Sequence, residues 1–213
     1  MKVKNAVICA AGLGSRLGLN VPKCLVPIGG KKLIHYLLQL VKDIENVHIV
    51  VGYKEEEVIN YVRSIRNNVV FVRNPNYNTT SNSHSLYLGT KDFTEPYLTI
   101  DGDMILEKTE FDGFINAINP TQDLIGVSKA KTDDAVFTKV NEKGELVEFS
   151  RERIDNFEWC GIAYFVNVKI QSEASYIYEQ IIPHLPLQSH CIECWEIDTP
   201  NDLNLALNEI PFI

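Results

Sequence analysis

The sequence lacks the features of several large protein classes. None of its apolar runs reaches the roughly 20 residues that a membrane-spanning helix needs. Its 20 Lys and Arg are outnumbered by 28 Asp and Glu, for a formal net charge of −8, so the basic face of a nucleic-acid binder is not expected. There is no internal repeat, low-complexity segment or linker. With 213 residues, the chain is expected to form one domain with a substantial core and no membrane or nucleic-acid partner.

A secretion signal and a disulfide framework are not expected either. Residues 1–4 lead directly into the first expected strand and leave no room for a signal peptide. The five cysteines are odd in number, and Cys9 lies in that strand, which suits a reducing compartment. Cys191 and Cys194 form a single C-x-x-C pair beside His190, which could bind zinc, but without a second pair two free thiols in a strand are favoured. A cytoplasmic location is expected.

The chain is organised around residues 6–23, AVICAAGLGSRLGLNVPK. An apolar run typical of a buried strand is followed by small residues, a hydroxyl and two cations: Ala10, Ala11, Gly12, Gly14, Ser15, Arg16 and Lys23. A glycine-rich turn after a strand lets backbone N–H groups approach phosphate oxygens without a side-chain clash. Arg16 and Lys23 add the positive charge that a polyphosphate needs, so this stretch is expected to bind one.

Two common phosphate-binding motifs are excluded in this stretch. The P-loop is absent because no Gly-Lys-Ser/Thr follows the first glycine at the required spacing. The dinucleotide fingerprint is absent because Leu17 occupies its third glycine position and residues 31–33 contain no acid. What remains is the pattern G-x-G-[ST]-R followed by P-K.

Expected strands and helices alternate along the chain, and this order predicts an α/β fold with a mostly parallel sheet and helices on both faces. In the first half, strands are expected at 7–10, 47–51, 69–72 and 97–100, and helices at 33–44, 54–65 and 82–90. In the second half, strands are expected at 124–130, 136–141, 158–168 and 191–197, and helices at 172–182 and after residue 200. The polar stretch 74–85 is expected to be a loop, with Ser81 or Asn82 capping the next helix. A small β-rich insertion in the second half is expected to form one wall of a substrate cleft.

Asp101 and Asp103 flank a single glycine at the end of the fourth expected strand. Ligands of open α/β sheets bind beyond the carboxyl ends of the strands. Two carboxylates there suit Mg²⁺, which takes one or two carboxylates together with phosphate oxygens. Asp-Gly-Asp is also good turn chemistry, so a solvated turn is the alternative. The glycine-rich stretch upstream favours the metal site.

Residues 6–28, 99–104 and 195–203 together resemble the sugar-nucleotidyltransferase superfamily, whose members join a nucleoside triphosphate to a phosphorylated small molecule. The resemblance spans essentially the whole chain. It implies a Rossmann-like three-layer sandwich of the nucleotide-diphospho-sugar transferase type. It also implies one domain, 1–213, with a nucleotide-binding half at 1–104 and an acceptor-binding half at 105–213.

The resemblance assigns roles to the motif residues. Lys23 and Arg16 would be catalytic, and the nucleotide would be held by Ala10, Ala11, Gly12, Gly14, Ser15, Asn82, Ser85 and Asp101. Mg²⁺ would be held by Asp103 and by Asp198, an aspartate near the C-terminus. Glu196 is a second candidate ligand, because residues two apart share a strand face. The alternative for Asp198 is the N-cap of a helix that begins at Pro200.

The acceptor half resembles the small cytidylyltransferases, such as the phosphocholine cytidylyltransferases of bacterial surface-glycan pathways, and Lys131 and Gly161 match that branch. The tryptophan of its choline cage would fall near residue 136, where only Phe137 is aromatic, although Trp159 could contribute from elsewhere. Arg151 and Arg153 lie in a cluster of both charges that suits a zwitterionic acceptor, and a solvated charged loop is the alternative. A phosphoglutamine-like acceptor, as used in capsule phosphoramidate synthesis, fits this cluster better than phosphocholine.

The expected function is a Mg²⁺-dependent cytidylyltransferase. CTP and a phosphoglutamine- or phosphocholine-like metabolite would give a CDP-linked product and pyrophosphate, for modification of a capsule or surface glycan. The alternatives are a sugar-1-phosphate nucleotidyltransferase using UTP or dTTP, and a non-catalytic nucleotide-sensing module. A monomer or a homodimer is compatible with the sequence.

Overall fold

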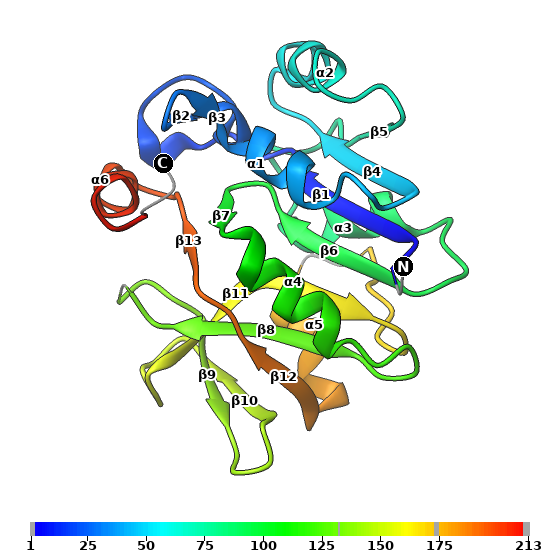
Figure 1. Cartoon of the computed structure of the whole chain (residues 1–213), viewed down its shortest axis with the longest axis vertical. Coiled ribbons are helices and arrows are strands. Elements are labelled where there is room, and N and C mark those ends of the chain that lie inside the picture. Colours follow the sequence, from blue (N-terminus) through cyan, green and yellow to red (C-terminus); the bar gives the residue numbers. More distant parts are fainter. Residues whose placement is uncertain (1–2, 132, 173–174, 211–213) are drawn as a thin grey trace.

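A computed structural model of the chain describes residues 3–131, 133–172 and 175–210. Its centre is a nine-stranded sheet (Figure 1). The strands lie in the order β5 (Val70–Arg73), β4 (Asn46–Val51), β1 (Asn5–Ala10), β6 (Tyr97–Asp101), β11 (Phe157–Phe165), β8 (Leu124–Lys129), β12 (Leu187–Cys191), β10 (Glu145–Ser150) and β9 (Phe137–Val140). The sheet thus runs without interruption from the first half of the chain into the second.

The sheet is mixed, so the predicted mostly parallel sheet is wrong, although the predicted α/β class holds. Strands β5, β4, β1 and β6 are parallel to one another. Strand β11 is antiparallel to both β6 and β8, and β10 is antiparallel to both β9 and β12. The connections differ between the halves: β1, β4 and β5 are linked through α1 and α2, as parallel neighbours require, whereas β9 and β10 are joined by the short turn at residues 141–144, which reverses the chain direction.

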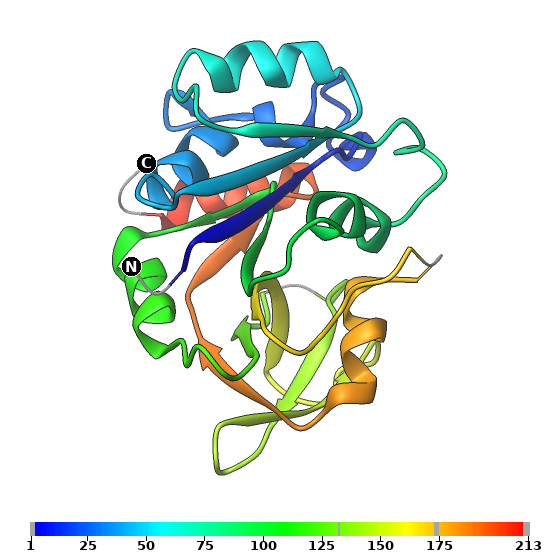
Figure 2. The same cartoon turned by 90° about the vertical axis from the view of Figure 1, so that its right-hand side faces the viewer.

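Helices cover both faces of this sheet (Figures 1 and 2). One face packs against α1 (Leu33–Leu40), α2 (Glu55–Arg63) and α4 (Lys108–Ala117), and the other against α3 (Asn82–Thr90) and α5 (Ile177–Ile181). Side chains alternate along β1, so Ala6 and Ile8 enter the first core and Val7 the second. This arrangement has three layers. Among the described residues, no helix is long and apolar enough to span a membrane.

A third, smaller core lies beyond the carboxyl ends of β1 and β6. It is built from two short two-stranded sheets and one helix: β2 (Pro27–Ile28) with β3 (Lys31–Lys32), β7 (Met104–Leu106) with β13 (Cys194–Glu196), and α6 (Pro200–Glu209). Short 3₁₀ turns, η1 (Ser15–Leu17), η2 (Lys23–Leu25) and η3 (Ile182–His184), complete the described elements. Ile28, Ile105, Trp195 and Ala206 pack together there. In Figure 1, β13 leads directly into α6 at this end of the molecule.

Several predicted elements differ from the observed ones. The single strand expected at 191–197 is two strands, because Cys191 pairs with β8 whereas Cys194 pairs with β7. The helix expected at 172–182 is shortened to α5, with residues 173–174 outside the described range. Strand β7 and helix α4 were not expected. All five cysteines are free thiols.

Candidate active site

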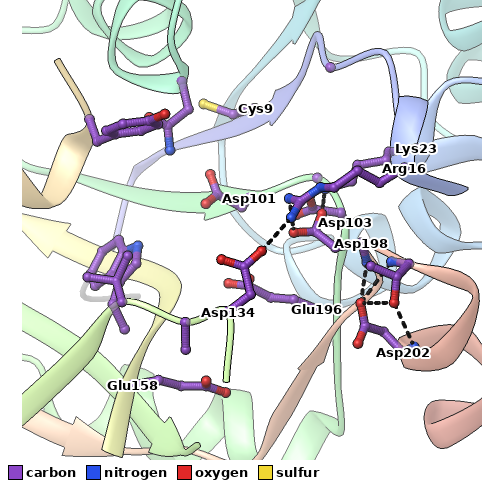
Figure 3. Close-up of a pocket in the computed structure, with 18 of the residues that line it drawn as sticks. Cys9, Arg16, Lys23, Asp101, Asp103, Asp134, Glu158, Glu196, Asp198 and Asp202 are labelled. Carbon is purple, nitrogen blue, oxygen red and sulfur yellow. Dashed lines mark hydrogen bonds and ion pairs between the residues drawn. The ribbon is translucent and has the colours of Figure 1, made fainter. Parts of the chain in front are cut away.

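A cleft of about 830 Å³ opens beyond the carboxyl ends of β1 and β6, where Cys9 and Asp101 are paired across the two strands. Its walls come from both halves of the chain (Figure 3). The predicted site residues that line it are Ala10, Ala11, Gly12, Arg16, Lys23, Asn82, Ser85, Asp101, Asp103, Lys131, Arg151, Trp159 and Asp198. Gly14, Ser15, Arg153 and Gly161 are not among its lining residues.

The glycine-rich loop brings two cations to this cleft. Gly14 has a φ of 65°, and a Cβ there would lie 2.9 Å from Lys23 Cγ, so a larger residue would strain the backbone and push Lys23 aside. Gly14 thus shapes the loop without lining the cleft. The turn η1 then directs Arg16 into the cleft, and η2 begins at Lys23 directly after Pro22.

Lys23 and Arg16 are held by acidic side chains at the centre of the cleft (Figure 3). The Lys23 ammonium forms ion pairs with both Asp103 and Asp198. Arg16 Nη2 donates to Asp198 Oδ2 at 2.6 Å, and Arg16 Nη1 donates to Asp134 Oδ2 at 2.9 Å. The cations and acids that the sequence placed far apart therefore form one connected network.

The pairing of β7 with β13 places Asp198 beside Asp103. Glu196 pairs with Met104, and Ile197 N donates to Asp103 O at 3.0 Å. Asp198 follows directly, and its carboxylate lines the cleft. The C-terminal part of the chain thus adds the Asp198 carboxylate to a site to which the N-terminal half contributes Lys23 and Asp103.

The helix-cap alternative for Asp198 is wrong. Thr199 is the N-cap of α6: its Oγ1 accepts from Asp202 N at 3.3 Å, and its own N–H donates to Asp202 Oδ2 at 2.8 Å. This reciprocal pair is a capping box, which satisfies helix-end donors without Asp198. The side chain of Asp198 is therefore available to the cleft.

Asp101 lies at the crowded back of the acidic cluster. Gly161 on β11 has a φ of 73°, and a Cβ there would lie 2.9 Å from Asp101 Oδ2. Enclosure by the cleft walls, together with the nearby charge of Asp103, raises the pKa of Asp101 to about 8, against the lowering effect of Lys23. Gly161 therefore contributes to the site by leaving room for Asp101.

The acidic cluster has the donor chemistry that Mg²⁺ prefers. Asp101, Asp103, Asp198 and Glu196 all line the cleft and offer carboxylate oxygens. In the described part of the chain, no three His, Cys, Asp or Glu side chains are grouped to hold an ion, and the Lys23 ammonium lies between Asp103 and Asp198. The ligand types fit Mg²⁺, and a bound ion would share these acids with Lys23.

The loop before α3 also contributes to the cleft. Asn74 is buried and organises this loop, because its Nδ2 donates to Thr80 Oγ1 at 3.1 Å and to Ser85 Oγ at 3.0 Å. Asn82 and Ser85 line the cleft together with Tyr77. The N-cap of α3 is Ser81, one of the two residues expected there.

The basic residues predicted in the second half of the chain have different surroundings. Lys131 lines the cleft, with its Nζ 4.9 Å from the centroid of the Trp195 ring. Arg151 also lines it and donates from Nη2 to Asp134 Oδ1 at 2.8 Å. Arg153 instead forms an ion pair with Asp133, with its Nη2 3.1 Å from Asp133 Oδ1. Its guanidinium carbon also lies 4.8 Å from the centroid of the Phe137 ring. The predicted charge cluster is thus divided: Arg151 lines the cleft, whereas Arg153 does not line it and pairs with the lining residue Asp133.

Sequence reasoning missed several residues that line the cleft. They are Tyr77, Asp134, Glu158, Tyr176, Tyr178 and Trp195. The rings of Tyr176 and Tyr178 stack with centroids 5.9 Å apart, so aromatic surface is present although residue 136 is valine. Burial raises the pKa of Glu158, whose carboxylate accepts from Ser128 Oγ at 3.4 Å. The acids beside Lys131 and Trp159 were a usable signal in the sequence, whereas Tyr176 and Tyr178 belong to a segment expected to be helical.

The chain belongs to the MobA-like NTP transferase domain family, which residues 6–162 match. The resemblance to nucleotidyltransferases is thereby confirmed. Choline-phosphate cytidylyltransferase of Streptococcus pneumoniae is 38% identical over 111 residues, which are 50% of this chain and 47% of that protein. 2-Aminoethylphosphonate cytidylyltransferase of Lancefieldella rimae is 28% identical over 170 residues, 76% of this chain and 66% of that protein.

The match to other curated relatives is more partial. Bifunctional protein GlmU of Methanocaldococcus jannaschii is 31% identical over 108 residues, 48% of this chain and 26% of that protein. The matched part of the chain thus spans 47% of the choline-phosphate cytidylyltransferase and 26% of the GlmU protein, which is less than half of either relative.

Solved structures share the fold over nearly the whole chain. The inositol-1-phosphate CTP transferase of T. maritima superposes with a TM-score of 0.77 and 18% identity, covering 99% of this chain and 98% of its own. The CTP:phosphocholine cytidylyltransferase of Streptococcus pneumoniae gives a TM-score of 0.78 and 22% identity, covering 97% and 99%. These proteins show the nucleotidyltransferase fold, Rossmann-like as the sequence predicted.

Proposed function

We propose that this protein is a Mg²⁺-dependent cytidylyltransferase that joins CTP to a small phosphorylated metabolite. The observation that carries the proposal is the network in which Lys23 and Arg16 meet Asp103 and Asp198 in one cleft. Two cations and several carboxylates at the carboxyl ends of β1 and β6 form a site for a metal-bound triphosphate. Residues 1–104 would supply the nucleotide side of the cleft and the later residues the acceptor side.

The residues of the cleft suit a direct phosphoryl displacement. The acceptor phosphate is already ionised, so no strong general base is required, and catalysis rests on alignment and charge neutralisation. Arg16 would hold the leaving phosphates, and Lys23 would stand between the acceptor phosphate and the α-phosphate. Mg²⁺ bound by Asp103 and Asp198, with Asp101 assisting, would neutralise charge on the triphosphate. Lys131 would hold the acceptor phosphate.

The acceptor side favours a metabolite that also carries a positive charge. Tyr176, Tyr178 and Trp159 present aromatic surface, and Asp134 and Glu158 add negative charge. Cationic groups bind to aromatic faces and to carboxylates. An acceptor of the phosphocholine or phosphoglutamine kind combines such a group with a phosphate, and the named relatives act on choline phosphate and 2-aminoethylphosphonate. A role in surface-glycan or capsule modification rests on the family resemblance.

Pyrophosphate release tests this function directly. CTP, UTP, dTTP, ATP and GTP would each be combined with a panel of small phosphorylated metabolites that includes phosphocholine, phosphoglutamine and hexose 1-phosphates. Release is expected with CTP and a phosphorylated acceptor that carries a cationic group, and it should require Mg²⁺. Wrong bases are expected to fail because they leave buried polar groups of the base pocket unpaired.

Other outcomes of the same assay would contradict the proposal. Turnover with UTP or dTTP and a hexose 1-phosphate would identify a sugar-1-phosphate transferase. CTP binding without pyrophosphate release across the panel would favour a sensing module. Lys23→Met serves as the inactive control for background hydrolysis.

A further inference from the structure

Tyr53 contacts both ends of the glycine-rich loop. Its backbone N–H donates to Ala11 O, at the start of the loop, at 3.1 Å. Its phenol Oη donates to Asn20 Oδ1, near the end of the loop, at 2.6 Å. One residue thus joins the two ends of residues 11–20, the segment that carries Arg16.

The neighbour of Tyr53 strengthens this contact. Lys54 Nζ donates to Asn20 O at 2.6 Å and lies 5.5 Å from the centroid of the Tyr53 ring. Asn20 and Lys54 have φ values of 48° and 47°, a region that residues other than glycine seldom adopt. Backbone of this kind persists where surrounding contacts hold it in place. The two strained residues therefore lie at the point where the loop is fastened.

The same turn also contacts the loop that precedes α3. A Cβ on Gly52 would lie 2.7 Å from Tyr77 Cβ and 2.9 Å from Ala11 O, so only glycine allows this approach. The rings of Tyr53 and Tyr77 have centroids 6.1 Å apart, and Tyr77 lines the cleft. Residues 52–54 are thus in contact with both loops of the nucleotide side.

We propose that Tyr53 is a positioning residue that preorganises the triphosphate subsite. This inference rests on the proposed function. Tyr53 is not one of the lining residues of the cleft, so it acts through Ala11 and Asn20 and not through contact with substrate. The loop contains positive φ values at Gly14, Gly18 and Asn20, and a freed loop of this composition must be ordered again when nucleotide binds.

The loop must be ordered when CTP binds, and this timing determines the expected kinetic effect. Once CTP is bound, the loop is in place for both the ground state and the transition state. The loss of preorganisation therefore weakens both equally, which raises KM and leaves kcat unchanged. A residue needed only for general folding would instead lower the amount of active protein without a selective change in KM for CTP.

Tyr53→Phe tests the inference because it keeps the ring beside Tyr77 and Lys54 and removes the hydroxyl donor. The Kd of CTP by calorimetry and the KM of CTP are expected to rise about three- to ten-fold, the range for one lost hydrogen bond. The kcat at saturating CTP and the KM of the acceptor should stay within about two-fold. Hydrogen exchange of residues 12–20 in the nucleotide-free protein should become faster, while exchange in the strands of the central sheet is unchanged.

Three further variants make the comparison specific. Asn20→Gly removes the acceptor of the phenol and still permits a positive φ. Since both substitutions delete the same hydrogen bond, the double variant is expected to bind CTP no more weakly than the weaker single variant. Tyr61→Phe is the matched control, because its hydroxyl accepts from Lys32 N at 3.4 Å away from the loop. It should keep the wild-type KM.

Unchanged CTP affinity and unchanged loop exchange in Tyr53→Phe would overturn the inference. The inference would also be overturned if the losses of CTP affinity in Tyr53→Phe and Asn20→Gly multiplied in the double variant. If the wild-type protein binds none of the nucleoside triphosphates, the proposed function fails. Loop exchange in the nucleotide-free protein then still decides whether Tyr53 holds the loop.

Discussion

Asp134 accepts a hydrogen bond from Arg16 across the cleft, although the two residues are 118 positions apart in the chain. The other oxygen of the same carboxylate accepts from Arg151, in the second half of the chain. Asp134 thus neutralises an arginine from each half of the chain. Phosphate groups that enter the cleft would compete with Asp134 for both guanidinium groups.

This competition predicts that Asp134→Asn binds CTP more tightly. Both partners of the Arg16 pair are largely exposed, so its contribution is small and the expected decrease in the Kd of CTP is about two- to five-fold. Calorimetry at low and at high salt measures it, and the gain should shrink as salt screens the pair. Weaker CTP binding by Asp134→Asn would show that the carboxylate supports the nucleotide and does not compete with it.

Lys23 is expected to matter most for the rate. Lys23→Met keeps most of the aliphatic stem and removes the ammonium that pairs with Asp103 and Asp198. Loss of one preorganised charge at a reacting phosphate typically lowers kcat by a factor on the order of 10²–10³. The affinity for CTP should fall less, because Arg16 and the loop amides remain. Steady-state kinetics and calorimetry together check this, and an unchanged kcat with a large loss of affinity would make Lys23 a ground-state binder.

Asp198 and Thr199 are adjacent and are expected to behave differently on substitution. Asp198→Asn removes a charge from the cleft, so activity should fall by orders of magnitude across a Mg²⁺ titration while Tm is retained. Thr199→Ala removes the N-cap of α6 and should lower the free energy of unfolding by about 1 kcal/mol. Thermal melts and pyrophosphate release on both variants make the comparison. Near wild-type activity in Asp198→Asn would place the metal site elsewhere.

Gly161 is expected to be needed for the position of Asp101. Gly161→Ala would put a Cβ 2.9 Å from Asp101 Oδ2 at a φ of 73°. Gly144→Ala is the matched control, because Gly144 has a φ of 76° and no atom within 4 Å of a new Cβ. Both variants should lose about 1–2 kcal/mol of unfolding free energy from the positive φ. Only Gly161→Ala should also lose pyrophosphate release, and equal activity in the two variants would contradict a role beyond the backbone.

Local patterns in the sequence were sufficient for the features that depend on neighbouring residues. The small residues before Arg16 and the Pro22–Lys23 step predicted a glycine-rich loop after β1, because turn chemistry and backbone freedom are set within a few positions. Short apolar runs predicted β1, β4 and β6 for the same reason. Asp101 and Asp103 could be placed in a cleft because the carboxyl ends of parallel strands meet at one edge of a sheet.

The capping of α6 was also present in the sequence but was assigned to the wrong residue. Thr199 and Asp202 have the spacing of a capping box, whereas Asp198 was taken as the alternative cap. The local sequence was therefore sufficient to identify the N-cap, but Asp198 and Thr199 are adjacent polar residues that could each cap the helix.

Only the tertiary structure decided the rest of the site. The ion pair of Asp134 with Arg16, the pairing that places Asp198 beside Asp103, and the contact of Tyr53 with Asn20 all join residues from different elements. Such contacts depend on strand order and direction, as with the antiparallel entry of β11 beside β6. Periodicity determines which face of a strand is buried, but it does not determine which strand lies next to it. The free energy of packing the whole chain makes that choice, because neighbouring strands are selected by burial and hydrogen bonding between segments far apart in sequence.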